Sequence, residues 1–147
     1  MEATTNVRQL LQGKGASVWS VAPDDSVFEA LELMAEKNVG ALVVMEGDTL
    51  AGMFSERDYA RKVILLGRAS RDTAVRDVMS DHVVTVGPEK TVVDCMLAMT
   101  EHRIRHLPVV EEGRLIGLVS IGDVVKAIMS EQSFLIDQLQ SYIQGTT

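Results

Sequence analysis

The sequence contains the segment Gly52-Met53-Phe54-Ser55-Glu56-Arg57-Asp58, and a related segment, Gly117-Leu118-Val119-Ser120-Ile121-Gly122-Asp123, follows it 65 residues later. In each, a short apolar run that starts with glycine leads into Ser-x-x-Asp, which is typical of a capping box at the start of a helix. The spacing extends without a gap, because residues 18–62 align on residues 83–127 with 13 identities in 45 positions. The chain therefore contains an internal repeat, and this repeat decides the fold.

Both copies predict the same order of elements: strand, helix, strand, strand, helix. The first helix starts at a hydroxyl with an acid three residues later, Ser26 in one copy and Thr91 in the other. The apolar runs that follow are continuous, as in buried strands. Pro108 cannot donate to a ladder, so its strand is expected to begin there or to lie at an edge. The expected strands are residues 18–21, 41–45 and 50–54 in the first copy and residues 83–86, 107–110 and 115–119 in the second.

The predicted fold class is therefore mixed α/β (α+β), with two tandem β-α-β-β-α repeats packed as a pseudo-two-fold module. Residues 7–66 form the first repeat and residues 74–130 the second, and a helical extension covers residues 131–147. Each copy begins with a short helical lead-in, since residues 73–79 resemble residues 6–11. Neither copy has enough elements to cover its own sheet, so the two are expected to pack together.

Composition narrows the functional class. The net charge of −7 argues against general binding to nucleic acids or to anionic membranes. The single cysteine, Cys95, cannot form an intrachain disulfide, and the first residues have no signal-peptide pattern. The longest uninterrupted apolar run, Ala41 to Met45, is too short to span a bilayer. We therefore expect a soluble, cytoplasmic protein.

The two Ser-x-x-Asp segments, together with Arg103–Val110, resemble the cystathionine-β-synthase (CBS) family, here as the usual pair of domains known as a Bateman module. The resemblance covers nearly the whole chain, with no catalytic domain attached. It implies two clefts between paired sheets that hold AMP, ADP, ATP, S-adenosylmethionine or a dinucleotide. Carried over, Asp58 and Asp123 take the ribose hydroxyls, with Ser55 and Ser120 beside the ribose and phosphate.

The resemblance also implies the rest of each nucleotide site. The end of the first strand and the start of the second would flank the base, and arginine can neutralise phosphate. The full predicted set is Ser20, Val21, Gly40, Ala41, Ser55, Arg57 and Asp58 in the first copy, and Thr85, Val86, Arg105, His106, Pro108, Ser120 and Asp123 in the second. Arg57 has Gly122 as its equivalent and Arg105 has Gly40, which indicates that the two sites differ. No metal site, catalytic residue or catalytic cofactor is expected.

Each of these residues also has a structural interpretation. Ser-x-x-Asp is a capping box in its own right, so both aspartates can be helix caps. Arg57 and Arg105 can equally be solvated, His106 can be a surface histidine, and Arg61 is better explained as part of a solvated face. Cys95 aligns with Ala30 and is interpreted as a small buried residue.

Two functions remain open: a sensor that binds an adenine nucleotide and signals to an unknown regulated protein, and a structural interaction module with empty pockets. An enzyme is disfavoured, because the sequence has no phosphate-binding glycine loop and no nucleophile-base motif. A homodimer is also expected. Beyond Met129 the helical pattern continues, and one apolar face must cover its own core or a partner: Ile128, Leu135, Leu139 and Tyr142.

Overall fold

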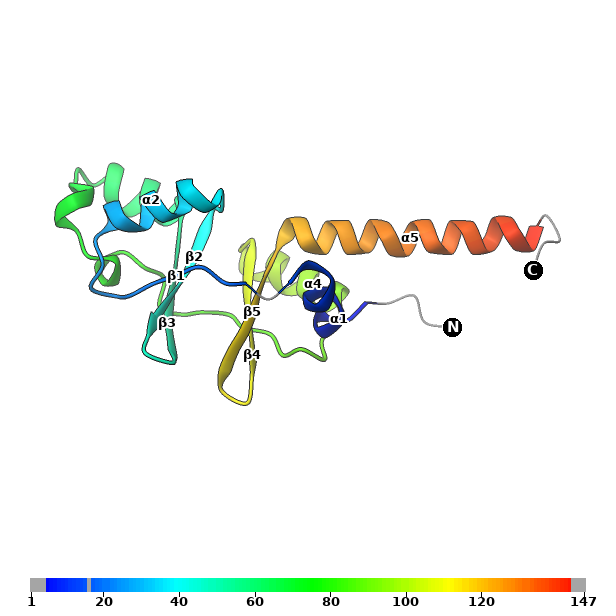
Figure 1. Cartoon of the computed structure of the whole chain (residues 1–147). Helices are drawn as coiled ribbons and strands as arrows, with labels where there is room; N and C mark the ends of the chain where they lie inside the picture. Colours follow the sequence, from blue (N-terminus) through cyan, green and yellow to red (C-terminus); the bar gives the residue numbers. More distant parts are fainter. Residues whose placement is uncertain (1–4, 16, 144–147) are drawn as a thin grey trace. The chain divides into compact units, whose positions relative to one another are not determined.

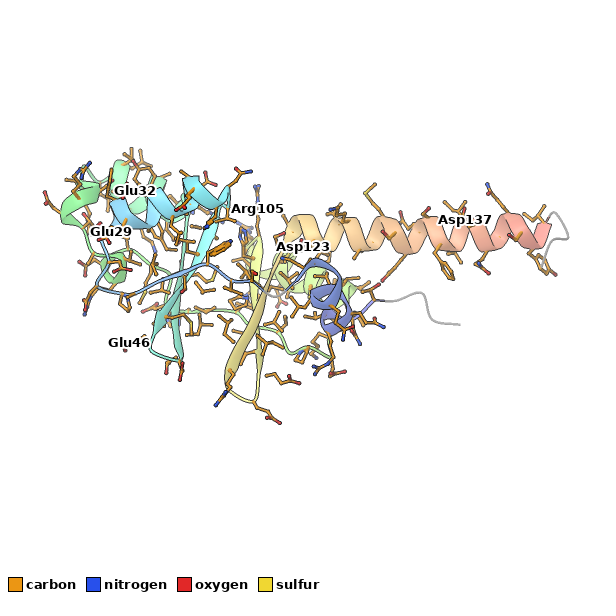
Figure 2. All side chains as sticks on the ribbon, in the orientation of Figure 1. Glu29, Glu32, Glu46, Arg105, Asp123 and Asp137 are labelled. Atoms are coloured by element: carbon orange, nitrogen blue, oxygen red, sulfur yellow. The ribbon has the colours of Figure 1, made fainter. Side chains whose placement is uncertain are left out.

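The computed structural model describes residues 5–15 and 17–143, drawn with their elements in Figure 1 and with their side chains in Figure 2. These residues fall into two compact units, and neither unit is continuous in sequence. One comprises the residues before Ser17 with residues 85–111 and from 116 onwards, and the other comprises residues 17–84 with residues 112–115.

The first copy has the predicted order of elements. It consists of β1 (Ser20–Val21), α2 (Val27–Lys37), β2 (Ala41–Glu46), β3 (Thr49–Ser55) and α3 (Glu56–Tyr59), which continues as a π-helical turn over Ala60–Ile64. The sheet order is β1-β2-β3, with β1 parallel to β2 and β2 antiparallel to β3. The mixed α+β class predicted from the sequence is confirmed.

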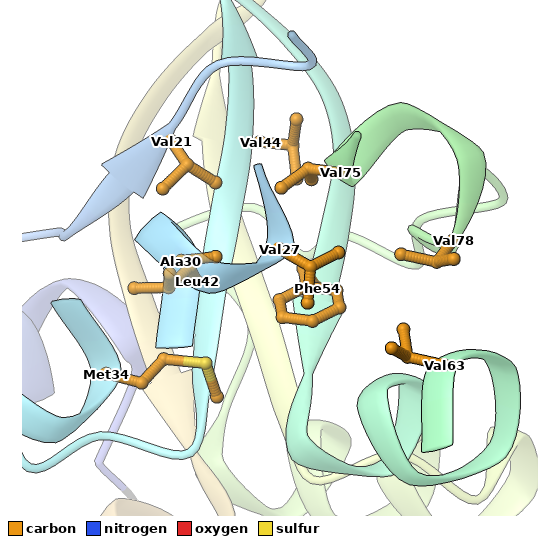
Figure 3. Packing of buried hydrophobic residues seen from close by; sticks show 10 residues of the cluster. All are labelled: Val21, Val27, Ala30, Met34, Leu42, Val44, Phe54, Val63, Val75 and Val78. Atoms are coloured by element: carbon orange, nitrogen blue, oxygen red, sulfur yellow. The ribbon is translucent and has the colours of Figure 1, made fainter. Parts of the chain in front are cut away.

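The core of this copy includes two residues from the segment that precedes the second copy. Val75 and Val78 are fully buried beside Phe54 and Val63 (Figure 3). Aliphatic side chains fill the remaining space between α2 and the sheet: Val21, Val27, Ala30, Met34, Leu42 and Val44. The lead-in of the second copy is thus part of the hydrophobic core of the first.

The second copy consists of α4 (Val92–His102), β4 (His106–Glu111), β5 (Arg114–Ser120) and α5 (Ile121–Ile143). The predicted strand over residues 83–86 was wrong: only an isolated parallel bridge between Val86 and Val109 forms there. In the first copy, Val43 N donates to Trp19 O at 3.4 Å and extends the ladder back along β1. The equivalent of Val43 is Pro108, which has no N–H, so the ladder shrinks to the bridge.

Pro108 itself lies inside β4, two residues after the strand begins, instead of at its first residue. The bridge tolerates it, because Val86 uses the carbonyl of Pro108 and the N–H of Val110, at 3.1 and 2.9 Å. The sheet has the order β4-β5, so the other expectation for Pro108, a strand at a sheet edge, is met.

The two lead-ins are exchanged between the copies. The first, α1 (Val7–Lys14), lies in the unit of the second copy, where Val7 N donates to Lys90 O and Val92 N to Thr5 O. The second consists of two 3₁₀ turns, Ser70–Asp72 and Val75–Asp77. It lies in the unit of the first copy, where Val27 N donates to Thr73 O at 2.8 Å. Each copy is therefore completed by the segment that precedes the other.

The C-terminal extension is continuous with the last helix of the second copy. α5 runs unbroken for 23 residues, and the predicted residues 144–147 lie outside the described part of the chain. The Glu131 carboxylate accepts a hydrogen bond from Thr5 N, and every residue from 132 to 140 is exposed. No helix in residues 5–15 and 17–143 is long and apolar enough to cross a membrane.

Candidate functional site

Asp58 lies at the start of α3, where every hydrogen bond that its carboxylate can accept is already made. One oxygen, Oδ2, accepts from Ser55 N and Ser55 Oγ at 3.0 and 3.1 Å, which completes the capping box. The other, Oδ1, accepts from Ser80 Oγ at 3.0 Å and faces Lys62 Nζ at 3.3 Å. A carboxylate has about four acceptor positions, so four donors saturate this one. Its side chain is 11% exposed.

Asp123 occupies the equivalent place at the start of α5 (Figure 2), with fewer partners. Ser120 N and Lys14 Nζ both donate to Oδ2, at 2.9 and 2.6 Å. The Ser120 side chain adds a third hydrogen bond to the carboxylate. The side chain of Asp123 is 21% exposed, about twice the fraction of Asp58. Asp123 therefore has fewer donors around it than Asp58, and its carboxylate can accept a further hydrogen bond.

The electrostatics of Asp123 favour its ionised form. Burial raises the pKa of this carboxyl, but the hydrogen bonds from Lys14 and from Ser120 N–H, with the Lys14 charge, outweigh burial and hold the pKa below its ordinary value. An ionised carboxylate is an acceptor only and can take a bond from a hydroxyl group. The site is thus suited to a hydroxyl-bearing or cationic group.

In both copies one residue, which we call the clasp, binds the motif aspartate together with the neighbouring strand; it is the last residue of the first lead-in helix, Lys14, or the residue directly after the second lead-in, Ser80. Ser80 donates from its Oγ to Asp58 and from its N–H to Met53 O at 2.8 Å. Lys14 does both with its ammonium, donating to Asp123 and, at 2.9 Å, to Leu118 O. Met53 and Leu118 are equivalent positions of the repeat. The same two acceptors are therefore held by a neutral clasp in one copy and by a cationic clasp in the other.

The glycine of each motif leaves space for the close approach of the lead-in that packs against it. A Cβ on Gly52 would lie 2.7 Å from the backbone oxygen of Ser80, and one on Gly117 would lie 2.7 Å from Leu11 Cδ2. Both contacts are closer than real side chains allow, so only glycine fits without a shift. The repeated Gly-x-x-Ser-x-x-Asp pattern thus allows the lead-ins to be exchanged between the copies.

One further predicted residue in each copy lies next to the start of the second helix of that copy. Gly40 O accepts from Glu56 N at 3.1 Å, and Arg105 O accepts from Ile121 N at 2.8 Å. The strand-end residues are in the sheets beside them: Ser20 and Val21 form β1, Ala41 starts β2, Val86 makes the bridge, and Pro108 is buried in β4.

The polar residues predicted around the phosphate differ in exposure. Arg57, Arg105 and Thr85 are exposed and His106 is half-buried. Gly122, where the first copy has Arg57, has only Ser120 Oγ near its missing side chain, at 3.6 Å. The first turn of α5 is consequently open, whereas the equivalent position of α3 carries an arginine.

Sequence reasoning missed the residues that bind the two aspartates. Lys62 could have been found, because it lies one helical turn after Asp58. Lys14 and Ser80 lie 109 and 22 residues from their aspartates, and no local pattern connects them. Their role follows from the exchange of lead-ins, which the sequence does not reveal.

Cys95 is fully buried on α4, and burial, with a smaller effect from Asp94, raises the pKa of its thiol to about 11. A thiol in this state is a poor nucleophile. Within the described ranges, no group of three or more His, Cys, Asp or Glu side chains is placed to hold a metal ion.

Comparison with known proteins now identifies the class. The CBS domain pattern matches residues 16–64 and 75–130, and the chain belongs to the CBS-domain family. It is 43% identical over 97% of its length to the mitochondrial CBS domain-containing protein CBSX3 of Arabidopsis thaliana, of which it covers 73%. It is 38% identical to the CBS domain-containing protein YhcV of Bacillus subtilis, over 79% of this chain and 82% of that one.

Solved structures agree. A CBS-domain protein from Burkholderia ambifaria, for which a role in signal transduction has been suggested, superposes with a TM-score of 0.84 at 49% identity, covering 87% of this chain and 96% of that one. A hexameric CBS-CP12 protein from bloom-forming cyanobacteria superposes with a TM-score of 0.73 at 26% identity, covering 83% and 71%. The resemblance inferred from the repeat is confirmed.

Proposed function

We propose that this chain is a regulatory module without enzymatic activity, which binds an adenine nucleotide (AMP or a relative of it) and signals to a partner protein. The single observation that carries the proposal is the state of Asp123. It is an ionised, partly exposed carboxylate at the start of a long helix, with fewer donors than Asp58 and room to accept a further hydrogen bond. A ribose hydroxyl is a suitable donor for it.

The surroundings of Asp123 support the same ligand class. The N-terminal turn of a long helix favours an anionic group, since its N–H groups and dipole point toward it. The space beside Gly122 is open, and Arg105 is exposed on the segment that bonds to the first residue of α5. A ligand with a hydroxyl-bearing sugar and an attached phosphate matches this combination of acceptor and positive potential.

A structural role is the second candidate, and it fits the first copy. Asp58 has no acceptor position left, and α3 has only four α-helical residues before the π-helical turn. In this copy the motif serves as a cap and as an anchor for the lead-in. We therefore assign ligand binding to the second copy first, and treat a module with two empty sites as the alternative.

A thermal-shift panel separates the two candidates. AMP, ADP, ATP, NAD and S-adenosylmethionine are added at millimolar concentration, and a ligand at 100 times its Kd adds roughly 2.7 kcal/mol to the free energy of unfolding. The Asp123→Ala variant should lose about half of this stabilisation, since a tenfold higher Kd leaves roughly 1.4 kcal/mol at the same ligand concentration. Asp137→Ala, which changes an exposed carboxylate on the same helix, is the matched control and should keep it. The absence of any shift for all five ligands supports the structural module.

We also propose that the module is a homodimer, because α5 exposes apolar side chains that its own unit leaves uncovered. Cytoplasmic localisation stays a prediction from the sequence alone. The relative CBSX3 is named as a mitochondrial protein, so fractionation of the source cells is the appropriate measurement for this chain.

A further inference from the structure

The exposed part of α5 carries a second apolar pattern besides the predicted face. Six positions follow the alternating spacing of four and three residues that defines a coiled-coil seam. Five of the six are apolar and between 41% and 79% exposed. We call these six positions the α5 seam: Val125, Met129, Gln132, Ile136, Leu139 and Ile143.

The α5 seam is free of charge. The charged residues of the helix after Asp123 are Lys126, Glu131 and Asp137, and all three lie off the seam. A chain with a net charge of −7 repels a second copy over most of its surface. A neutral apolar stripe is a part of that surface where two copies can approach without bringing like charges together, whereas a charged partner would find no complementary group on it.

The intervals between the seam positions are the same in both directions along the helix. Read from either end, the intervals are four, three, four, three and four residues. Two copies of α5 related by a two-fold axis across the helix therefore meet position for position. Residue 125 then faces 143, residue 129 faces 139, and Gln132 faces Ile136. This arrangement is isologous, as the commonest dimers are, and it pairs opposite ends of the helix dipoles.

The helix itself needs such a partner. The seam spans roughly 27 Å at 1.5 Å per residue, and from residue 132 to residue 140 no part of α5 is covered by the described chain. This exposed stretch is nine residues long, and a helix shorter than about 12–15 residues is only marginally stable in water by itself. A contiguous apolar stripe of this size marks an interaction site.

We infer that the α5 seam is a homodimerisation surface, on which α5 of a second copy packs antiparallel. The inference rests on the homodimer proposed above and is independent of nucleotide binding. It places the two modules at opposite ends of the paired helices, where their net negative charges are well separated.

Light scattering on the full chain at micromolar concentration tests the surface. Wild type should show about twice the chain mass of 16.1 kDa. Ile136→Asp should weaken the dimer about 100-fold and give a single-chain mass, because it buries a charge in the seam. Phe134→Asp is the matched control: Phe134 is 41% exposed against 54% for Ile136, but it lies on the opposite side of the helix. It should remain dimeric.

Disulfide trapping tests the orientation and does not depend on a destabilising charge. Met129→Cys and Leu139→Cys proteins are oxidised separately and as a mixture, and buried Cys95 stays unreactive. In the antiparallel pair residue 129 faces residue 139, whereas the two copies of residue 129 are roughly 15 Å apart, too far for a bond. Cross-linking only in the mixture supports the inference.

Three results overturn it. A monomeric wild type removes the dimer altogether, and the nucleotide proposal is untouched. A dimer that survives Ile136→Asp with native circular dichroism places the interface elsewhere. Cross-linking of either variant alone, or of neither in any sample, excludes the antiparallel pair.

Discussion

The two copies of the repeat hold the same aspartate in different ways. Asp58 is enclosed by four donors from three residues, and its clasp, Ser80, is neutral. Asp123 accepts, among the described residues, from Ser120 and Lys14 alone, is more exposed, and its clasp, Lys14, is cationic. The two aspartates of the repeat thus differ in how far structural contacts saturate their acceptor positions. The comparison teaches that residues outside an identical motif place it in two different hydrogen-bond environments, one of which leaves room for the proposed ligand.

The helices that follow the two motifs also differ, in length and in regularity. α3 is four residues long and passes into a π-helical turn, whereas α5 continues for 23 residues. A long α-helix concentrates positive potential at its N-terminus, and the effect is confined to the first turn. The second copy therefore combines the less saturated carboxylate with the stronger anion-binding helix end. The four predictions below test this difference, from the largest expected effect to the smallest.

Removing the two carboxylates should affect stability unequally. Asp58→Ala leaves Ser80 Oγ and the Ser55 N–H without their partners in a buried place, and should lower the free energy of unfolding by about 3 kcal/mol. Asp123→Ala, at a more exposed position, should lower it by about 1 kcal/mol. Urea unfolding followed by circular dichroism measures both. Equal losses would mean that the two aspartates contribute equally to the free energy of unfolding.

Substitution of the two motif glycines by alanine should also lower stability unequally. Gly52→Ala places a Cβ against the Ser80 backbone, which cannot move without breaking the bridge between Met53 and Ser80, and should cost about 2 kcal/mol. Gly117→Ala meets only the end of the Leu11 side chain, which can change rotamer, and should cost about 1 kcal/mol or less. The melting temperatures of the two variants measure these losses of stability. A larger decrease for Gly117→Ala than for Gly52→Ala would contradict the proposed contacts.

Binding should show the reverse order. Asp123→Ala should weaken AMP binding by about 1.5 kcal/mol, roughly tenfold, since it removes the ribose acceptor but leaves the groups expected to contact the phosphate. Asp58→Ala should leave the affinity of the second copy unchanged, at a temperature where the variant is folded. Calorimetric titration of both variants provides the check. Loss of AMP binding in Asp58→Ala alone would assign the ligand to the first copy.

The ion pair of Lys14 with Asp123 should make the stability of the protein depend on pH. The pKa of Asp123 is lowered in the folded chain, so its contribution is present above the unfolded pKa and is lost as pH falls through the folded pKa. Lys14→Met removes the main cause of this shift and should cost up to about 1 kcal/mol at pH 7. The difference from wild type should shrink toward pH 2.

Lys126→Met serves as the control for the clasp, because Lys126 is an exposed lysine on the same helix as Asp123. Urea unfolding at pH 7 and at low pH compares the three proteins. A deficit in Lys14→Met that stays constant with pH would indicate that Lys14 stabilises the fold through Leu118 O alone.

Much of this architecture could be predicted from the sequence, because it depends on local chemistry. The capping boxes at Ser26, Ser55 and Thr91 form as their spacing predicts, and the continuous apolar runs become β2 and β4. The strand predicted at residues 83–86 failed for a non-local reason. Its potential partner is Pro108, and the register that aligns them is set only when the sheet forms.

Less of the functional site could be predicted from the sequence, because its contacts are also non-local. The sequence indicated both aspartates and their two interpretations, as caps or as ligand acceptors, but not the different hydrogen-bond partners that the two have in the structure. That difference depends on Lys14, Lys62 and Ser80, and two of these lie in or directly after the lead-ins exchanged between the copies. Contacts between segments this far apart have no periodicity that a single sequence can display.

The central claim, that this CBS pair binds an adenine nucleotide through its ribose, is tested most directly by calorimetric titration of wild type with AMP and with 2′,3′-dideoxy-AMP. We predict a saturable heat for AMP and an affinity roughly 10-fold to 100-fold lower for the dideoxy compound, which lacks the hydroxyls that Asp123 would accept. Equal affinity for the two compounds would contradict the role of the carboxylate. No heat with AMP, ADP, ATP, NAD or S-adenosylmethionine at millimolar concentration would contradict nucleotide binding itself.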